Sequence, residues 1–164
     1  MTVASEPALR VGARVLLLNN ADEVLLIHAR DPDNPDHHWW EQPGGGQHPG
    51  EKLEDTARRE IAEETGLVLG EIGRKLWTRE SRFTYRGRDH HRLDHVYLAR
   101  TDHDAPQVAL RHSANERVGL IERRWWSAAA VSTCRDKLLP AELPGLLQAL
   151  LDDRFPLTPL ALIA

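Results

Sequence analysis

Three glutamates close together on one predicted helix form a candidate site for a divalent metal ion. Glu60, Glu63 and Glu64 fall within an arc of about 100°, because an α-helix turns by about 100° per residue. Carboxylates gathered this closely repel one another unless a cation lies between them. Ligands that are all oxygen suit a hard ion such as Mg²⁺ or Mn²⁺. The helix therefore predicts a site for one of these two ions.

Glu64 also interrupts the apolar stripe that the same helix needs for packing. Leu53, Ala57 and Ile61 recur every four residues, and Glu64 projects between the first two of them. A carboxylate on a core-facing stripe is costly unless it is paired or bound to a metal ion. The alternative is a solvated acidic helix whose charges pair along its own surface. The stripe favours a functional, metal-bound carboxylate.

The segment Gly45–Leu67 resembles the Nudix box, G-x5-E-x7-R-E-U-x-E-E-x-G-U with U aliphatic, at every specified position. Seven of these positions fix the residue type, so chance agreement is on the order of 10⁻⁸ per start site. Near the box, Gln42 stands where the family often has an aliphatic residue, and Lys52 where it often has a Ser or Thr helix cap. The matching residues are Gly45, Glu51, Arg59, Glu60, Ile61, Glu63, Glu64, Gly66 and Leu67.

This resemblance to the Nudix hydrolase family implies a fold and a reaction. The fold is α/β (α+β), with a mixed β-sheet sandwiched between helices. The reaction is hydrolysis of a nucleoside diphosphate linked to another moiety, by water attack on a phosphate with carboxylate-bound Mg²⁺ or Mn²⁺. In the family a carbonyl of the glycine loop also reaches the metal. The implied metal-binding residues are Gly45, Glu60, Glu63 and Glu64.

The chemistry of the diphosphate suggests a role for each charged side chain. Bound metal ions neutralise the diphosphate and lower the pKa of bound water. Arg59 cannot bind a metal ion, so we expect it to orient a carboxylate through charge-assisted hydrogen bonds, with Glu51 as one candidate. The general base is either a box glutamate or a later loop glutamate, for which Glu116 is the best candidate. The candidate catalytic residues are Arg59, Glu60, Glu63, Glu64 and Glu116.

Aromatic and basic residues after the box are candidates for substrate recognition. Phe83 and Tyr85 share one strand face. Tyr85 lies eighteen residues past the box, where dinucleoside polyphosphate hydrolases of the family carry a tyrosine. The basic segment that follows offers Arg86 and Arg88 as phosphate contacts. The alternatives are core packing for Tyr85 and a solvated hairpin tip for the basic segment.

Two classes of function remain open. One is a metal-dependent pyrophosphohydrolase, a class that includes housecleaning enzymes for oxidised nucleoside triphosphates. The other is a Nudix-like module that binds a nucleotide in a regulatory role without hydrolysing it. The complete box favours the enzyme, because a pure binding module has no need of every carboxylate.

Length and composition fit one domain over residues 1–164. The net charge of −4 shows no general footprint of nucleic-acid binding. No stretch is apolar enough to span a membrane, and Met1–Arg10 lacks the apolar region of a signal peptide. The lone Cys134 excludes an internal disulfide and a cysteine-based zinc site. A cytoplasmic protein is the simplest expectation.

Hydrophobic patterning and turn residues predict an α/β order. The adjacent His37 and His38 are not expected to chelate a metal ion, because neighbouring side chains of an extended loop face opposite ways. The predicted elements are strands at Leu9–Leu18, Val24–His28, Leu76–Tyr85, Leu93–Arg100 and Ile121–Trp126, helices at Leu53–Thr65, from Ala128 and at Glu142–Leu151, and loops at Asp31–His38 and Thr101–Gly119.

The C-terminal tail, residues 152–164, stays apolar to its end. Its prolines discourage a helix and favour an extended strap. An apolar strap of this kind tends to be buried. It either docks on its own domain or crosses to a second copy in a homodimer.

Overall fold

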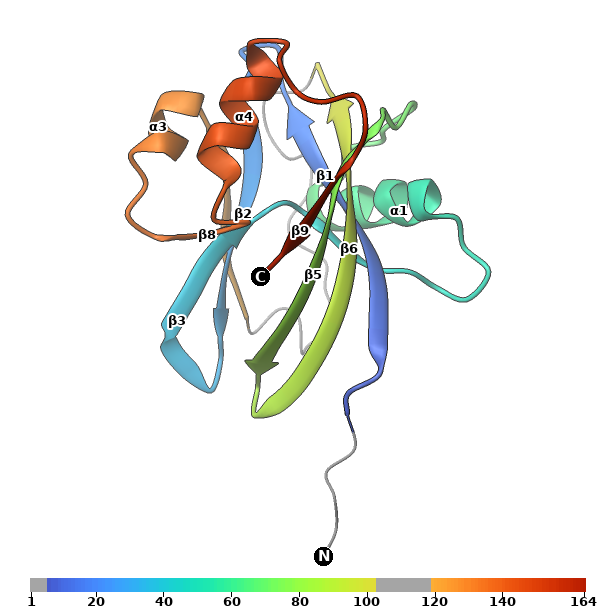
Figure 1. Ribbon diagram of the computed structural model, residues 1–164, viewed down its shortest axis with the longest axis vertical. Coiled ribbons are helices and arrows are strands. Elements are labelled where there is room, and N and C mark those ends of the chain that lie inside the picture. The colour runs from blue at the N-terminus through green and yellow to red at the C-terminus, as the bar shows by residue number, and fades with distance from the viewer. Residues whose placement is uncertain (1–5, 103–118) are drawn as a thin grey trace, which may run out of the picture.

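The protein, seen here as a computed structural model that describes residues 6–102 and 119–164, is built on a curled mixed β-sheet (Figure 1). The strand order is β8-β3-β2-β1-β6-β5-β9, while β4 pairs with β1 and β7 with β2. The strands are β1 (Leu9–Leu18), β2 (Val24–Asp31), β3 (Asn34–Glu41), β4 (Gly44–Gly46), β5 (Lys75–Tyr85), β6 (Arg88–Arg100), β7 (Leu120–Trp126), β8 (Lys137–Leu139) and β9 (Leu160–Ile163). The helices are α1 (Leu53–Thr65), α3 (Ala128–Ser132) and α4 (Leu143–Leu151).

Helices pack on both faces of the sheet, as expected from the family resemblance. Alternate side chains of β1 belong to two different core clusters. One cluster joins Val15 and Leu17 to Ala57 and Ile61 of α1. The other cluster joins the alternate β1 residues, whose side chains point to the opposite face of the sheet, to α4 and to the C-terminal tail. Its members on those elements are Leu16, Leu18, Leu143, Leu147 and Phe155.

Helix α1 has the bounds that the sequence predicts. Lys52 occupies the N-cap position but makes no side-chain capping bond. Gly66 ends the helix in the left-handed conformation, with φ of 75°, and its N–H donates to the Ala62 carbonyl. This ending fixes the direction in which the chain leaves the glutamate-bearing turns.

One predicted loop is wrong. The segment Asp31–His38 was expected to be irregular, yet Asn34–Glu41 forms β3, which pairs antiparallel with β2 and parallel with β8. Only the turn itself lacks strand structure, and there the Asp31 carboxylate accepts the Asp33 N–H at 2.9 Å. Pairing on both sides of the two tryptophans overrides the low strand propensity of Pro and Asp. Most of the predicted loop Thr101–Gly119 lies outside the described residues.

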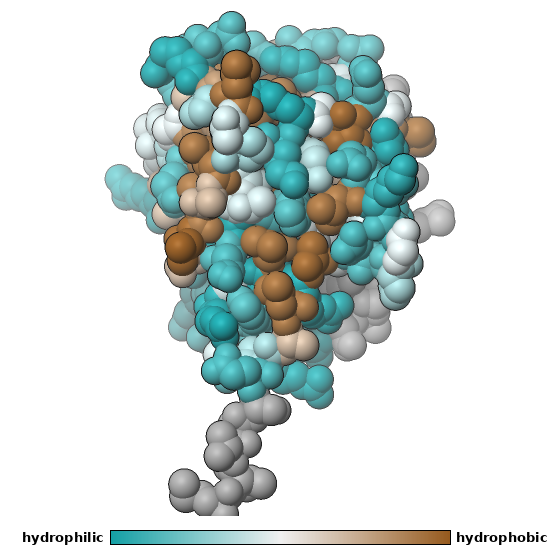
Figure 2. Space-filling view, turned by 45° about the vertical axis from the view of Figure 1, so that its right-hand side comes forward, coloured by the Kyte–Doolittle hydropathy of each residue, from teal (hydrophilic) through white to brown (hydrophobic). Residues whose placement is uncertain are grey.

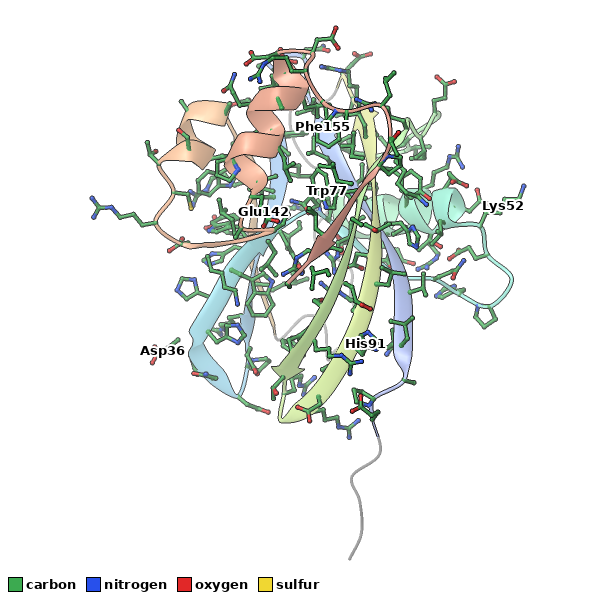
Figure 3. All side chains as sticks on the ribbon, viewed as in Figure 1. Asp36, Lys52, Trp77, His91, Glu142 and Phe155 are labelled. Atoms are coloured by element: carbon green, nitrogen blue, oxygen red, sulfur yellow. The ribbon has the colours of Figure 1, made fainter. Side chains whose placement is uncertain are left out.

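The C-terminal tail docks on its own chain. Phe155 is buried, and its ring centroid lies 6.3 Å from that of Trp77 (Figure 3). The Arg74 guanidinium lies 5.3 Å from the Phe155 ring centroid. Strand β9 then pairs in parallel with β5. A homodimer built through this tail stays a prediction.

The surface is largely polar. On the face shown in Figure 2, apolar groups lie between hydrophilic side chains. The most exposed large apolar side chains of the described residues are Val68, Leu157 and Ile163. Within the same residues, no helix is long and apolar enough to cross a membrane.

Truncation after Arg154 should lower the free energy of unfolding by about 2 kcal/mol or more, because burial of one Phe side chain contributes ~1.5–3 kcal/mol. For a chain of this size that corresponds to a fall in Tm of about 4–8 °C. Leu157→Ala is the control, since that side chain is exposed. An unchanged Tm in the truncated chain contradicts docking. Light scattering of the same samples tests the homodimer.

Candidate active site

Arg59 ties the start of the Nudix box to its glutamates. Its Nε and Nη2 each donate to a Glu51 oxygen at 3.0 Å. Its Nη1 donates to Glu60 Oε1 at 2.9 Å and lies 3.6 Å from Glu63 Oε1. Its Nη2 also donates to the Gly46 carbonyl at 2.8 Å. One guanidinium therefore holds the helix, the glycine strand and the intervening loop in a fixed relation.

Glu51 is locked in its ionised form. The hydrogen bonds from Arg59 and then from the Thr56 hydroxyl, at 2.6 Å, lower the pKa of Glu51 to about 2. The His48 N–H donates to the same carboxylate at 3.1 Å. A carboxylate held this strongly is a poor proton acceptor near neutral pH. Glu51 is thus an anchor for Arg59, and it is the carboxylate that the sequence indicated as one candidate partner.

Glu64 is the buried carboxylate of the cluster, with 7% of its surface exposed. Burial raises its pKa well above the ordinary value, and the neighbouring Glu60 raises it further. Arg14 and a hydrogen bond from the Gly44 N–H act in the opposite direction. Among the described residues, Glu64 Oε2 has no hydrogen-bonding partner. A buried carboxylate oxygen without a donor fits a metal ligand better than a structural polar group.

Gly45 brings its backbone directly against the box helix. A Cβ at this position would collide with the Glu60 carboxylate, so any larger residue would push that carboxylate out of its present place. The Gly45 carbonyl oxygen faces Gly12 of β1 and would lie 2.7 Å from a Cβ placed there. Together with Glu63, whose side chain is 48% exposed, these groups offer only oxygen atoms. Such a donor set fits Mg²⁺ or Mn²⁺.

A cavity of about 330 Å³ opens beside these oxygen atoms. Its walls include the glycine strand, the carboxylates Glu60 and Glu64, and the side chains of Phe83, Tyr85 and Arg92. A second cavity, of about 700 Å³, shares three wall residues with the first. The shared residues are Glu41, Phe83 and Arg92.

The predicted substrate residues divide between this cavity and the hairpin turn. Tyr85 lines the cavity, on the same strand face as Phe83. Arg86 and Arg88 are not among the described residues that wall either cavity. The Arg86 backbone N–H instead donates to both Asp31 oxygens at 3.2 Å, which joins the hairpin to the β2–β3 turn. Glu116 lies outside the described residues.

Sequence reasoning missed a buried ionic network between the two cavities. Arg14, 9% exposed, lies 3.3 Å from both Glu41 and Asp94 and donates to the Gln42 carbonyl at 2.7 Å. Arg92 lies 2.6 Å from Asp94 and 3.4 Å from Glu41. The signal was an arginine inside the apolar stretch from Val11 to Leu18, since charged residues are rarely buried without partners. The network positions Gln42 just ahead of the glycine strand.

Known proteins show the same domain. The model of the family described as the NUDIX domain matches residues 8–149. A putative 8-oxo-dGTP diphosphatase of Bacillus subtilis (strain 168) is 44% identical over 55 residues, which are 34% of this chain and 34% of that protein. The chain therefore spans about a third of the length of this relative.

Solved structures with the same fold include three Nudix proteins. The MutT NUDIX hydrolase from Burkholderia pseudomallei has a TM-score of 0.60 at 22% identity, over 86% of this chain and 97% of that one. The MutT protein from Methanosarcina mazei Go1 has a TM-score of 0.61 at 20% sequence identity, over 93% of this chain and 100% of that one. The NUDIX domain of NrtR from Shewanella oneidensis, solved with ADP ribose, has a TM-score of 0.61 at 22% sequence identity, over 90% of each chain. Because the family model covers most of the sequence and the box is complete, the chain belongs to the NUDIX domain family.

Proposed function

We propose that this protein is a metal-dependent pyrophosphohydrolase that cleaves a nucleoside diphosphate linked to another moiety. The observation that carries the proposal is Glu64, a buried carboxylate with an unpartnered oxygen, set beside Glu60 at the wall of a cavity. Glu60, Glu63, Glu64 and the Gly45 carbonyl would bind Mg²⁺ or Mn²⁺. The complete carboxylate set argues against a module that only binds a nucleotide.

Each charged residue of the site would have a distinct role in such a reaction. When bound, the metal ions neutralise the diphosphate and lower the pKa of the attacking water. Arg59 donates a hydrogen bond of 2.9 Å to Glu60 and is itself held in place by hydrogen bonds to the ionised Glu51. Arg14 opposes the rise in the pKa of Glu64 and so helps to keep that carboxylate ionised. A box glutamate or Glu116 would accept the proton of the water.

The two adjoining cavities suggest where a substrate would lie. The diphosphate would occupy the smaller cavity, against the glycine strand and the box glutamates. The rest of the substrate would extend past Phe83 into the larger one, which Trp39 also lines. Aromatic walls of this kind suit a nucleobase. The Bacillus subtilis relative supports an oxidised nucleoside triphosphate as one substrate.

A substrate screen tests the proposal. Nucleoside triphosphates, including 8-oxo-dGTP, sugar nucleotides and dinucleoside polyphosphates would each be incubated with the protein and Mg²⁺ or Mn²⁺. We expect metal-dependent release of a nucleotide product from at least one group. Nucleotide binding without product in every group would contradict hydrolysis and support the regulatory module.

Tyr85→Ala should raise KM for the substrate found in this screen. Stacking of an aromatic ring on a base is worth about 1–3 kcal/mol, which corresponds to a factor of roughly 5–150. Tyr85→Phe is the matched control, because it keeps the ring at the cavity wall. A loss of thermal stability with unchanged KM would show that Tyr85 serves only in packing.

A further inference from the structure

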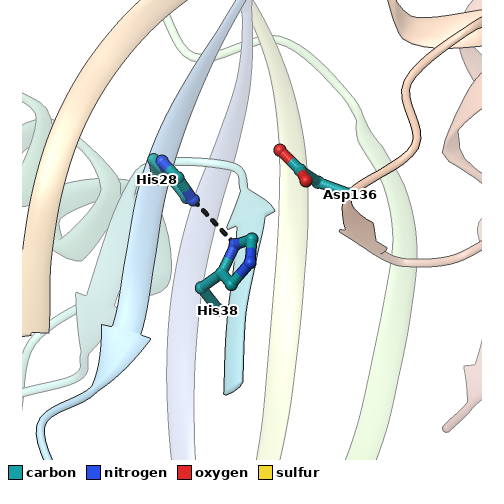
Figure 4. A group of neighbouring side chains, drawn as sticks. All are labelled: His28, His38 and Asp136. Atoms are coloured by element: carbon teal, nitrogen blue, oxygen red, sulfur yellow. Dashed lines mark hydrogen bonds between the residues drawn. The ribbon is translucent and has the colours of Figure 1, made fainter. Parts of the chain in front are cut away.

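Two histidines and an aspartate that do not belong to the Nudix box meet where β2, β3 and β8 lie side by side (Figure 4). His28 Nε2 and His38 Nδ1 are 3.0 Å apart. One oxygen of Asp136 completes the group, and the three potential ligand atoms lie within 4.8 Å of one another. The strands therefore assemble two nitrogen donors and one oxygen donor around a common point.

Strand register explains why these side chains converge. His28 pairs with Trp40 and Arg30 pairs with His38 across β2 and β3, so both histidines project from the same face of the strand pair. Leu138 of β8 pairs with Trp40. Asp136 precedes it by two residues, just outside β8. His37 and His38 do face opposite ways, as expected. The partner of His38 comes from β2 rather than from its own neighbour.

The surroundings of the cluster resemble those of a metal site. His28 Nδ1 lies 3.7 Å from Glu122 Oε1, and the imidazole stacks on the Trp40 indole at 4.3 Å. Trp40 Nε1 donates to Asp136 Oδ2 at 3.0 Å. In metal proteins a ligating histidine commonly gives its other N–H to a carboxylate, and ligating carboxylates are themselves hydrogen-bonded. Asp136 has the second kind of support, whereas Glu122 lies near His28 Nδ1 but beyond hydrogen-bond distance.

We propose that His28, His38 and Asp136 form a second metal site, which binds Zn²⁺ or a similar transition-metal ion rather than Mg²⁺. Two imidazoles and a carboxylate form a donor set that suits zinc, whereas Mg²⁺ prefers oxygen ligands only. Tetrahedral ligands at about 2.0–2.1 Å from the metal ion lie roughly 3.3 Å apart, close to the observed nitrogen separation. Asp136 is exposed, and Trp40 holds one of its two oxygens, which leaves the other oxygen to bind the ion. Three protein ligands leave a fourth position for water.

Metal titration of the full chain tests this site separately from the box. The background variant is Glu63→Gln/Glu64→Gln, which weakens the box, and excess Mg²⁺ occupies what remains of it. Zn²⁺ is titrated in competition with a chromophoric chelator, and Co²⁺ by its visible absorption. We expect each ion to bind with a stoichiometry of one per chain, at the same site. His38→Ala and Asp136→Asn should each weaken binding of the ion at least 10-fold.

His37→Ala is the matched control, because His37 sits on the same strand and faces the other way. It should leave Zn²⁺ affinity unchanged. Circular dichroism verifies folding, and the exposed Asp136→Asn keeps the test valid if a histidine variant unfolds. If Zn²⁺ binds equally with and without the His38 and Asp136 side chains, or does not bind in the box-deficient background, the two histidines are only a hydrogen-bonded pair and the proposal is wrong.

Discussion

Glu64→Gln should lower kcat by a factor on the order of 10² or more, because it removes a charge that stabilises the transition state while keeping the shape of the side chain. Its buried position leaves no solvent to replace the lost carboxylate oxygen. The measurement is steady-state release of the nucleotide product at saturating Mg²⁺ and at saturating Mn²⁺. Asp55→Asn is the control on the same helix, since Asp55 is exposed and pairs with Arg58. Near-wild-type turnover in Glu64→Gln at saturating metal would remove Glu64 from the metal site.

The same variant gives a second readout in the absence of metal. The pKa of Glu64 is raised above its unfolded value of 4.5, so ionisation of this group opposes folding. Its favourable contribution is complete below the unfolded pKa and is lost as pH rises through the folded pKa. In EDTA, wild-type Tm should therefore fall more steeply than that of Glu64→Gln as pH rises from 5. If the Tm of the two proteins changes with pH in the same way, Glu64 is not a buried carboxylate with a raised pKa.

The carboxylate cluster of the candidate site could be predicted because it is local. The carboxylates and Arg59 lie on one helix, so a period of 3.6 residues and a spacing motif are enough to group them. Helix α1 accordingly has the predicted bounds, and the buried Glu64 lies on the stripe where the sequence placed it. Two-residue alternation likewise placed Phe83 and Tyr85 on one wall of the cavity.

The remaining features depend on pairings between distant strands, which no local pattern encodes. His28 meets His38 only because β3 forms where a loop was expected. Arg14 meets Asp94 because β1 and β6 run parallel in a register that pairs Gly12 with Asp94. The residue types were visible in the sequence, but their partners were set by topology. Tertiary pairing also overrode the strand propensity of the segment that became β3.

Arg14→Leu should lower the free energy of unfolding by about 3–5 kcal/mol, because removal of one partner of a buried ion pair leaves uncompensated charge. Glu41 and Asp94, each 3.3 Å from the guanidinium, would then keep Arg92 as a shared ion-pair partner but lose the buried Arg14. The Gln42 carbonyl would also lose its donor. For a chain of this length, Tm should fall by roughly 6–20 °C. Urea unfolding at pH 7.5 measures the change.

Arg100→Leu separates burial from mere loss of an ion pair. The Arg100–Asp22 pair has a similar geometry, 2.9 Å, but both side chains are more than half exposed, so its loss should cost at most about 1 kcal/mol. Equal losses in the two variants would show that the Arg14 network behaves as a surface pair. Adding Glu41→Gln to Arg14→Leu should recover part of the stability, because removing both partners leaves fewer unpaired charges than removing one. The double variant cannot restore the donor to Gln42, so recovery stays partial. The shortfall measures how strongly Arg14 anchors the chain entering the glycine strand.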